Sequence, residues 1–171
     1  MFMKQVLPVL ILSVLLTACS QKYYIVRHAE KAQAAAGATM QTPGNPSLSP
    51  EGQQRAQALA ERLKAKNISA VFSTKTIRTE QTAMPTAEQF GLTIKSYAKV
   101  DTVFIRQLKQ VKGNTLIVGH SNTVDDLVNG LLGNNQLTDL PETAYDNLYI
   151  LTKKGKRLTL VQSKYGQPSP H

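Results

Sequence analysis

Short runs rich in apolar residues alternate with helical patterns along this chain, and no other feature constrains its fold as much. These runs predict buried strands at residues 22–26, 70–72 and 115–118, because a strand that is covered on both faces needs few polar positions. Between them, apolar residues recur at helical spacing. We therefore predict an α/β fold of three layers, α/β/α, with a mostly parallel central sheet.

The helices carry recognisable boundary signals. Ser49 is a predicted N-cap, Pro50 follows in the first turn, and apolar residues continue at helical spacing. A second helix is predicted to start at Thr76, with Pro85 ending or restarting it. The other predicted elements are a brief strand at 92–94, helices at 103–111 and 123–132, and two closing strands at 147–152 and 158–161.

The first nineteen residues have the pattern of an export signal. Lys4 gives a basic start, and the apolar stretch at 6–16 is shorter than the roughly 20 residues that cross a bilayer. Residues 16–19, Leu-Thr-Ala-Cys, resemble the lipobox of bacterial lipoproteins, and Cys19 is the only cysteine in the chain. An ordinary secretory signal with a stray cysteine is the alternative. We predict a signal peptide at 1–18 and a lipidated N-terminus at 19–21, with the lipid on Cys19.

A lipidated Cys19 would place the protein in a bacterial cell envelope. The membrane would be its partner through this anchor, and the residue after the cysteine, Ser20, favours the outer membrane. The folded domain would then face the periplasm or the cell surface.

The remaining chain is long enough for one domain with its own core, which we place at residues 22–165. The tail at 166–171, which contains Gly and Pro, is expected to be flexible. The 20 Lys and Arg against 11 Asp and Glu give a formal charge of +9, which favours anionic partners. The sequence has no dense basic tract interleaved with aromatic residues, so no nucleic-acid partner is expected.

Polar side chains follow three of the predicted strands. Arg27 and His28 come directly after the first strand, Arg78 lies one helical turn beyond the second, and His120 follows the third. Because ligands bind beyond the carboxyl ends of parallel strands, we expect these four side chains to meet at one sheet edge. A single histidine at a strand end is usually structural, but three matching positions together predict a site.

Four sequence blocks resemble, in order, the signatures of the histidine phosphatase superfamily, which has the phosphoglycerate-mutase-like fold. The resemblance covers about residues 22–152 and favours the small branch of the superfamily. The blocks are VRHAE at 26–30, LSPEG at 48–52, STKTIRTEQTA at 73–83 and VGHSN at 118–122.

This resemblance implies a metal-independent phosphatase that acts on phosphate monoesters or phosphoramidates. His28 would be the nucleophile that becomes a phosphohistidine, and His120 would donate to a phosphoryl oxygen. Arg27 and Arg78 would bind the phosphoryl group, since a guanidinium group pairs with its oxygens bidentately. No cofactor or metal is required in this scheme, and the partner is a phosphorylated substrate.

The proton donor for the leaving group is less clear. Ser121 stands where the larger branch of the superfamily has Asp, so the candidate general acid is Asp101, the only carboxylate between Gly91 and His120. Without an acid, the enzyme would prefer good leaving groups, including those of phosphohistidine and other phosphoramidates. Ser121 and Asn122 are candidate phosphate-binding residues, or else they cap the following helix.

Three alternatives stay open at this point. A mutase shares the site, but the chain has little room for the insertions that enclose a phosphoglycerate. A non-catalytic, lipid-anchored protein that binds an anion or a partner would keep the same pocket. Metal binding by the two histidines would lack a short ligand spacing such as H-x-x-x-H. Residues 32–47 and 134–146 are expected to shape the specificity, and neither segment identifies a substrate.

Overall fold

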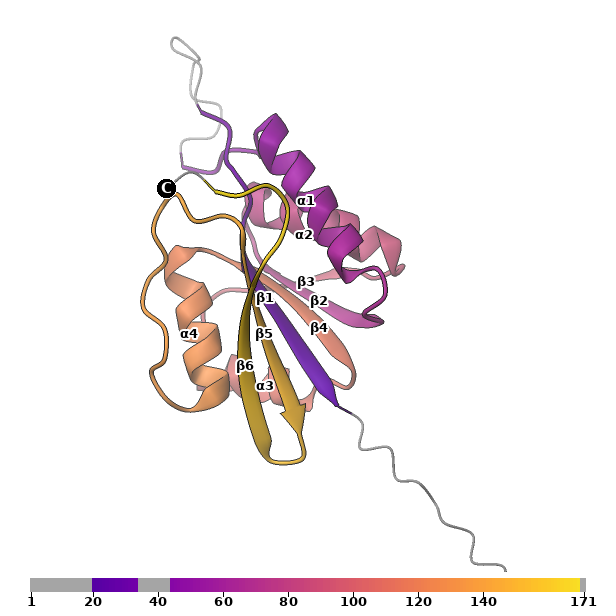
Figure 1. Ribbon diagram of the computed structural model, residues 1–171, viewed down its shortest axis with the longest axis vertical. Coiled ribbons are helices and arrows are strands. Elements are labelled where there is room, and N and C mark those ends of the chain that lie inside the picture. The colour runs from indigo at the N-terminus through magenta and orange to yellow at the C-terminus, as the bar shows by residue number, and fades with distance from the viewer. Residues whose placement is uncertain (1–19, 34–43, 170–171) are drawn as a thin grey trace, which may run out of the picture.

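A six-stranded sheet lies at the centre of the molecule, with helices on both of its faces (Figure 1). The computed structural model describes residues 20–33 and 44–169. Its elements are β1 (Gln21–Arg27), α1 (Pro50–Leu63), β2 (Ile68–Thr74), α2 (Ile77–Gln89), β3 (Ile94–Tyr97), α3 (Thr102–Gln110), β4 (Asn114–Gly119), α4 (Ser121–Leu132), β5 (Asn147–Lys154) and β6 (Arg157–Lys164).

The strand order is β3-β2-β4-β1-β5-β6. The pairs β3–β2, β2–β4 and β4–β1 are parallel, whereas β1–β5 and β5–β6 are antiparallel. The predicted three-layer α/β/α fold with a mostly parallel sheet is therefore confirmed. Because β1 and β4 are neighbours and parallel, the residues that follow them come out at the same edge of the sheet.

Alternate residues of β1 belong to different cores. Tyr23 and Ile25 pack with α3 and α4, while Tyr24 and Val26 pack with α1 and α2. All four side chains are buried, as expected for a strand with helices on both faces. Every strand and helix of the described fold follows Ser20, so a chain that starts at Ser20 contains the complete sheet and both cores.

The start of α1 fixes the loop that follows β1. Ser49 Oγ accepts a hydrogen bond from the Gly52 backbone N–H at 3.1 Å, and the Ser49 N–H donates to the Glu30 carbonyl at 2.9 Å. A Cβ atom at Gly52 would collide with that same carbonyl oxygen. The LSPEG block therefore serves close packing of α1 on the loop that carries His28.

The main differences from the sequence prediction concern α2 and β3, and the bounds of several other elements shift by one to three residues. Helix α2 runs from Ile77 to Gln89 without a break at Pro85, because its buried face of Thr82, Ala83, Thr86 and Ala87 holds it in place. Strand β3 covers residues 94–97, later than the predicted 92–94. Strand β3 pairs with β2 through residues 94–97. It ends at Tyr97, whose hydroxyl donates to the Val118 carbonyl at 3.1 Å.

The segment at 165–169 has specific contacts, although the sequence favoured a flexible tail from Gly166. Arg55 Nη1 donates to the carbonyls of Tyr165 and Gln167 at 3.1 and 2.7 Å. Ser169 Oγ accepts from the Asp146 N–H at 3.0 Å. Backbone carbonyls and a serine are weak sequence signals, so this anchoring is visible only in three dimensions.

No helix within residues 20–33 and 44–169 is long and apolar enough to cross a membrane. The predicted signal peptide at 1–18 and the predicted lipidation site at Cys19 lie outside the described residues, as do the tail residues 170–171.

Candidate active site

The two histidines meet at the carboxyl edge of the sheet. The rings of His28, after β1, and His120, after β4, have centroids 5.3 Å apart in an edge-to-face arrangement. Arg78, in the first turn of α2, reaches the same place, with Nη2 3.3 Å from His120 Nδ1. Arg27 is the last residue of β1 and is 2 % exposed. The structure thus brings together the four side chains that were predicted to converge.

The hydrogen bonds of His28 define which of its nitrogens is free. Nδ1 lies 2.7 Å from the Ala29 carbonyl oxygen, which can only accept, so the proton is on Nδ1. Nε2 then carries the lone pair of the neutral ring, and it has no hydrogen bond to any described residue. The His28 N–H donates to the Gly119 carbonyl at 2.8 Å, which ties the loop after β1 to the end of β4.

The surroundings of His28 keep its ring neutral. Burial is the main cause that lowers the pKa of His28 to about 3, and the charges of Arg27, Arg78 and His120 lower it further. The hydrogen bond to Ala29 acts in the opposite direction. A neutral imidazole beside two cations is a nucleophile that stays available at mildly acidic pH.

His120 has the opposite tautomer. A guanidinium group can only donate, so His120 Nδ1 accepts from Arg78, and Nε2–H donates to Thr74 Oγ1 at 3.0 Å. Burial, followed by the charges of Arg78 and Arg27, lowers the pKa of His120 to about 4. Gly119 allows this position, since a Cβ atom there would collide with Thr123 Oγ1.

The two arginines have donors that the protein itself leaves unused. Nε of Arg27 and Nε of Arg78 are buried and have no hydrogen-bond partner among the described residues. Burial lowers the pKa of Arg78, and the charge of Arg27 lowers it further. Like charges that act on each other in this way favour an anion between them.

The segment at 141–145, which we call the rim segment, closes one side of the site and was not identified residue by residue from the sequence. Arg27 Nη1 donates to the Pro141 carbonyl at 2.9 Å, and Arg27 Nη2 pairs with Glu142 Oε2 at 2.9 Å. The Arg27 guanidinium lies 4.5 Å from the Tyr145 ring centroid. The only sequence signal was the prediction that 134–146 shapes specificity.

The other predicted site residues lie in different settings. Ser121 is at the site, where its hydroxyl donates to Glu142 Oε1 at 3.1 Å. Asn122 is exposed, and its side chain has no hydrogen bond to the described residues. The segment at 34–43, part of the loop expected to shape specificity, lies outside the described residues.

Asp101 is engaged elsewhere. Its carboxylate accepts from the Phe104 N–H at 2.9 Å as the N-cap of α3, and it pairs with Lys99 at 3.2 Å. The Phe104 bond, and then Lys99, lower the pKa of Asp101, whereas a general acid needs a raised one. Among the described residues, no hydrogen bond joins Asp101 to His28 or His120.

The described part of the chain has no group of three or more His, Cys, Asp or Glu side chains that could hold a metal ion. What the site does offer is a lone-pair nitrogen, a second imidazole and two guanidinium groups at one sheet edge. These groups together are able to bind a tetrahedral oxyanion, of which the phosphoryl group is the common biological case.

The sequence model of one protein family, the histidine phosphatase superfamily (branch 1), matches residues 23–101 of the chain. This range contains Arg27, His28 and Arg78, and the fold adds His120 from beyond it. Residues 23–101 are therefore similar to the histidine phosphatase superfamily. No curated protein matches its sequence.

Solved structures of low sequence identity share the fold. SixA from Agrobacterium tumefaciens is 20% identical, with a TM-score of 0.60, over 86% of this chain and 98% of its own. The protein histidine phosphatase SixA complexed with tungstate is 19% identical, with a TM-score of 0.65, over 84% and 96%. A mycobacterial glucosyl-3-phosphoglycerate phosphatase is 14% identical, with a TM-score of 0.59, over 86% and 99%.

Proposed function

We propose that this protein is a phosphatase in which His28 Nε2 attacks phosphorus. One observation carries the proposal: the Nδ1–H of His28 is fixed on the Ala29 carbonyl, so that the opposite nitrogen is free beside Arg27, Arg78 and His120. A ring held in one tautomer and orientation loses less entropy on reaction and presents a single nucleophilic atom.

The reaction runs in two displacements. Nε2 of His28 forms a bond to phosphorus while the bond from phosphorus to the leaving group breaks, and the leaving atom takes the electron pair. Water then attacks the phosphohistidine, releases inorganic phosphate and returns the lone pair to Nε2. Arg27 and Arg78 stabilise the negative charge on the equatorial oxygens in both steps.

His120 is suited to respond to the substrate. Its low pKa in the free protein comes from burial and from the two arginines. A bound dianion offsets the charges of Arg27 and Arg78, so it raises the pKa of His120 and favours a proton on Nδ1. That N–H then donates to a phosphoryl oxygen as charge develops.

The carboxylates near the site suggest the substrate class. Arg27 lowers the pKa of Glu142, and helix capping lowers that of Asp101, so neither is held as the protonated acid that a poor leaving group requires. We therefore propose substrates that leave readily, with phosphoramidates such as phosphohistidine first. The same class appears in the name of the protein histidine phosphatase SixA, which shares the fold.

We also propose that lipid on Cys19 attaches the protein to an envelope membrane. The support is the sequence of residues 1–19. Radiolabelled palmitate should enter the full-length chain expressed in a bacterium, and it should not enter the Cys19→Ala variant. Equal labelling of both chains would contradict the anchor.

Hydrolysis of p-nitrophenyl phosphate by the chain that starts at Ser20 tests the catalytic proposal. The assay contains EDTA and runs from pH 5 to pH 7.5. We expect turnover by the wild type, a loss of at least about 1,000-fold in His28→Ala, and no change in the remote control Glu88→Gln. An inert wild type that still binds tungstate would favour the non-catalytic anion-binding alternative, and equal activity of His28→Ala would exclude His28 as the nucleophile.

A further inference from the structure

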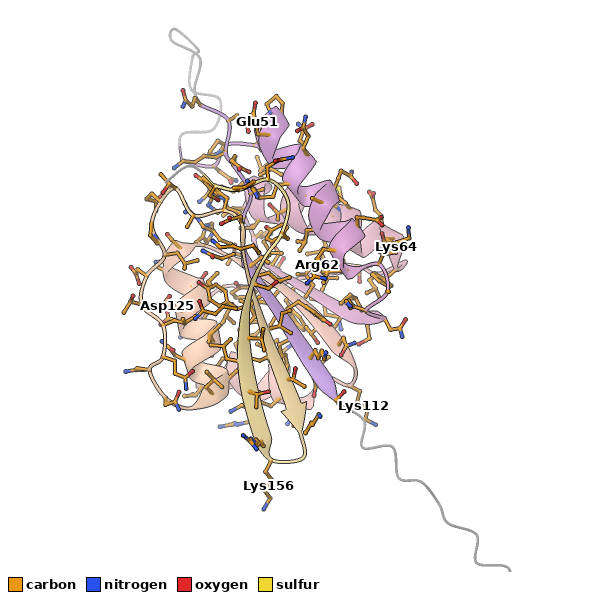
Figure 2. The ribbon with its side chains drawn as sticks, in the orientation of Figure 1. Glu51, Arg62, Lys64, Lys112, Asp125 and Lys156 are labelled. Carbon is orange, nitrogen blue, oxygen red and sulfur yellow. The ribbon has the colours of Figure 1, made fainter. Side chains whose placement is uncertain are left out.

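Eight basic residues gather at the end of the sheet opposite the active site. They come from the start of β1, the loops before β2 and β4, the end of α3 and the β5–β6 hairpin. We call them the basic face: Lys22, Lys66, Lys109, Lys112, Lys153, Lys154, Lys156 and Arg157. Figure 2 shows Lys112 and Lys156 at this end of the molecule and Glu51 at the other.

Hydrogen bonds and strand pairing hold these segments side by side. The side-chain amide of Asn114 accepts from the Lys22 N–H at 2.9 Å and donates to the Lys66 carbonyl. Lys153 Nζ donates to the Lys109 carbonyl at 3.5 Å. Lys154 lies opposite Arg157 in the strand register of the β5–β6 hairpin. The segments that carry the basic face are therefore neighbours at one end of the sheet.

The charges of the basic face are not neutralised by the protein. None of its eight cations forms an ion pair with a described residue, whereas Arg27, Arg55 and Lys164 at the other end all do. Asp126 lines a hollow together with Lys109 but forms no ion pair with it, and Glu61 pairs with Lys64 outside the face. Unpaired cations on one surface attract a polyanion.

The polypeptide enters the domain at this same surface. Ser20 lines a hollow of about 550 Å³ together with Lys22, Thr152, Lys154, Arg157 and Thr159. Figure 1 shows the start of β1 beside the tip of the β5–β6 hairpin, far from the carboxyl edge of the sheet. Ser20 therefore lies within the basic face.

We propose that the basic face binds an anionic phospholipid surface and thereby directs the active-site edge away from the bilayer. Lysine and arginine side chains at a membrane surface attract anionic headgroups within a Debye length, about 8 Å at physiological salt. A nucleic-acid strand is less well suited, because stacking needs exposed aromatic rings, and the exposed large hydrophobics of the described chain are Met84, Val103 and Val161. The proposal depends neither on the lipid anchor nor on phosphatase activity. A lipid anchor at Cys19 would attach the domain to the membrane through the same surface.

Vesicle co-sedimentation with the non-lipidated chain from Ser20 tests the proposal. The vesicles are phosphatidylcholine alone or phosphatidylcholine with 30% phosphatidylglycerol, in 100 mM and 500 mM NaCl. The test variant is the triple substitution Lys154→Gln, Lys156→Gln and Arg157→Gln. The matched control, Lys31→Gln with Lys75→Gln and Lys99→Gln, removes the same charge from exposed positions at the active-site end.

We expect binding to the anionic vesicles only, weakened by high salt and by about 100-fold in the test variant, with the control close to wild type. Equal weakening in both triple variants would show a net-charge effect and overturn a specific face. Absence of binding to anionic vesicles would overturn the proposal. So would preferential binding of a single-stranded oligonucleotide offered in competition with the vesicles.

Discussion

At the scale of single residues, the Arg27–Glu142 pair shows how the protein treats an anion. A buried guanidinium meets a carboxylate that is 71% exposed, and Ser121 donates to the second carboxylate oxygen. The carboxylate thus takes two donors that were predicted to bind a phosphoryl group. Substrate must displace Glu142 or bind beside its charge.

Replacing Glu142 should therefore strengthen oxyanion binding. We expect Glu142→Gln to bind tungstate about fivefold more tightly than wild type, a modest gain because the carboxylate is largely exposed. Titration calorimetry measures the change, with Glu88→Gln as a control of equal charge far from the site. Weaker binding by Glu142→Gln would mean that the carboxylate assists the ligand.

At the scale of elements, α3 tests whether Asp101 acts as an acid or as a cap. Asn caps a helix as well as Asp does, whereas Ala does not. We expect Asp101→Asn to keep both Tm and turnover, and Asp101→Ala to lower Tm by about 2–4 °C while turnover persists. Thermal melts and assays with an aryl and an alkyl phosphate measure both effects. Selective loss of alkyl phosphate turnover in Asp101→Asn would restore the general-acid assignment.

The elements also show how far the sequence predicts the site. The sequence predicts that Arg27, His28 and His120 lie together, because they end or follow two strands and parallel neighbouring strands end at the same edge of the sheet. Glu142 and Tyr145 could not be predicted in this way, since they reach Arg27 through a loop more than a hundred residues away in sequence. Pro85 misled the prediction because packing of α2 outweighs one lost hydrogen bond.

At the scale of the whole molecule, the two histidines make stability depend on pH. Their pKa values are lowered in the fold to about 3 and about 4, below the ordinary value of 6.5. Below pH 6.5 the unfolded chain therefore binds protons that the folded chain does not, so stability is fully present above pH 6.5 and falls as the pH falls.

The size of this effect can be isolated at His28. Between pH 7 and pH 5 the buried His28 should cost the wild type about 2 kcal/mol of unfolding free energy, at about 1.4 kcal/mol per pH unit below its unfolded pKa. Denaturant unfolding of the wild type and of His28→Gln at both pH values measures this cost. Both pH values lie above the range in which most carboxylates titrate. A variant with an unchanged pH dependence would show that His28 titrates normally in the fold.

The position of the phosphoryl group on the enzyme tests the central claim most directly. The chain from Ser20 is mixed with phosphoramidate, quenched in alkali during turnover and analysed by ³¹P–¹H correlation NMR and peptide mass spectrometry. The hydrogen bond from His28 Nδ1–H to Ala29 predicts phosphate on Nε2 of His28. Phosphate on His120, phosphate on Nδ1 of His28, or turnover with no phosphoenzyme would contradict the account.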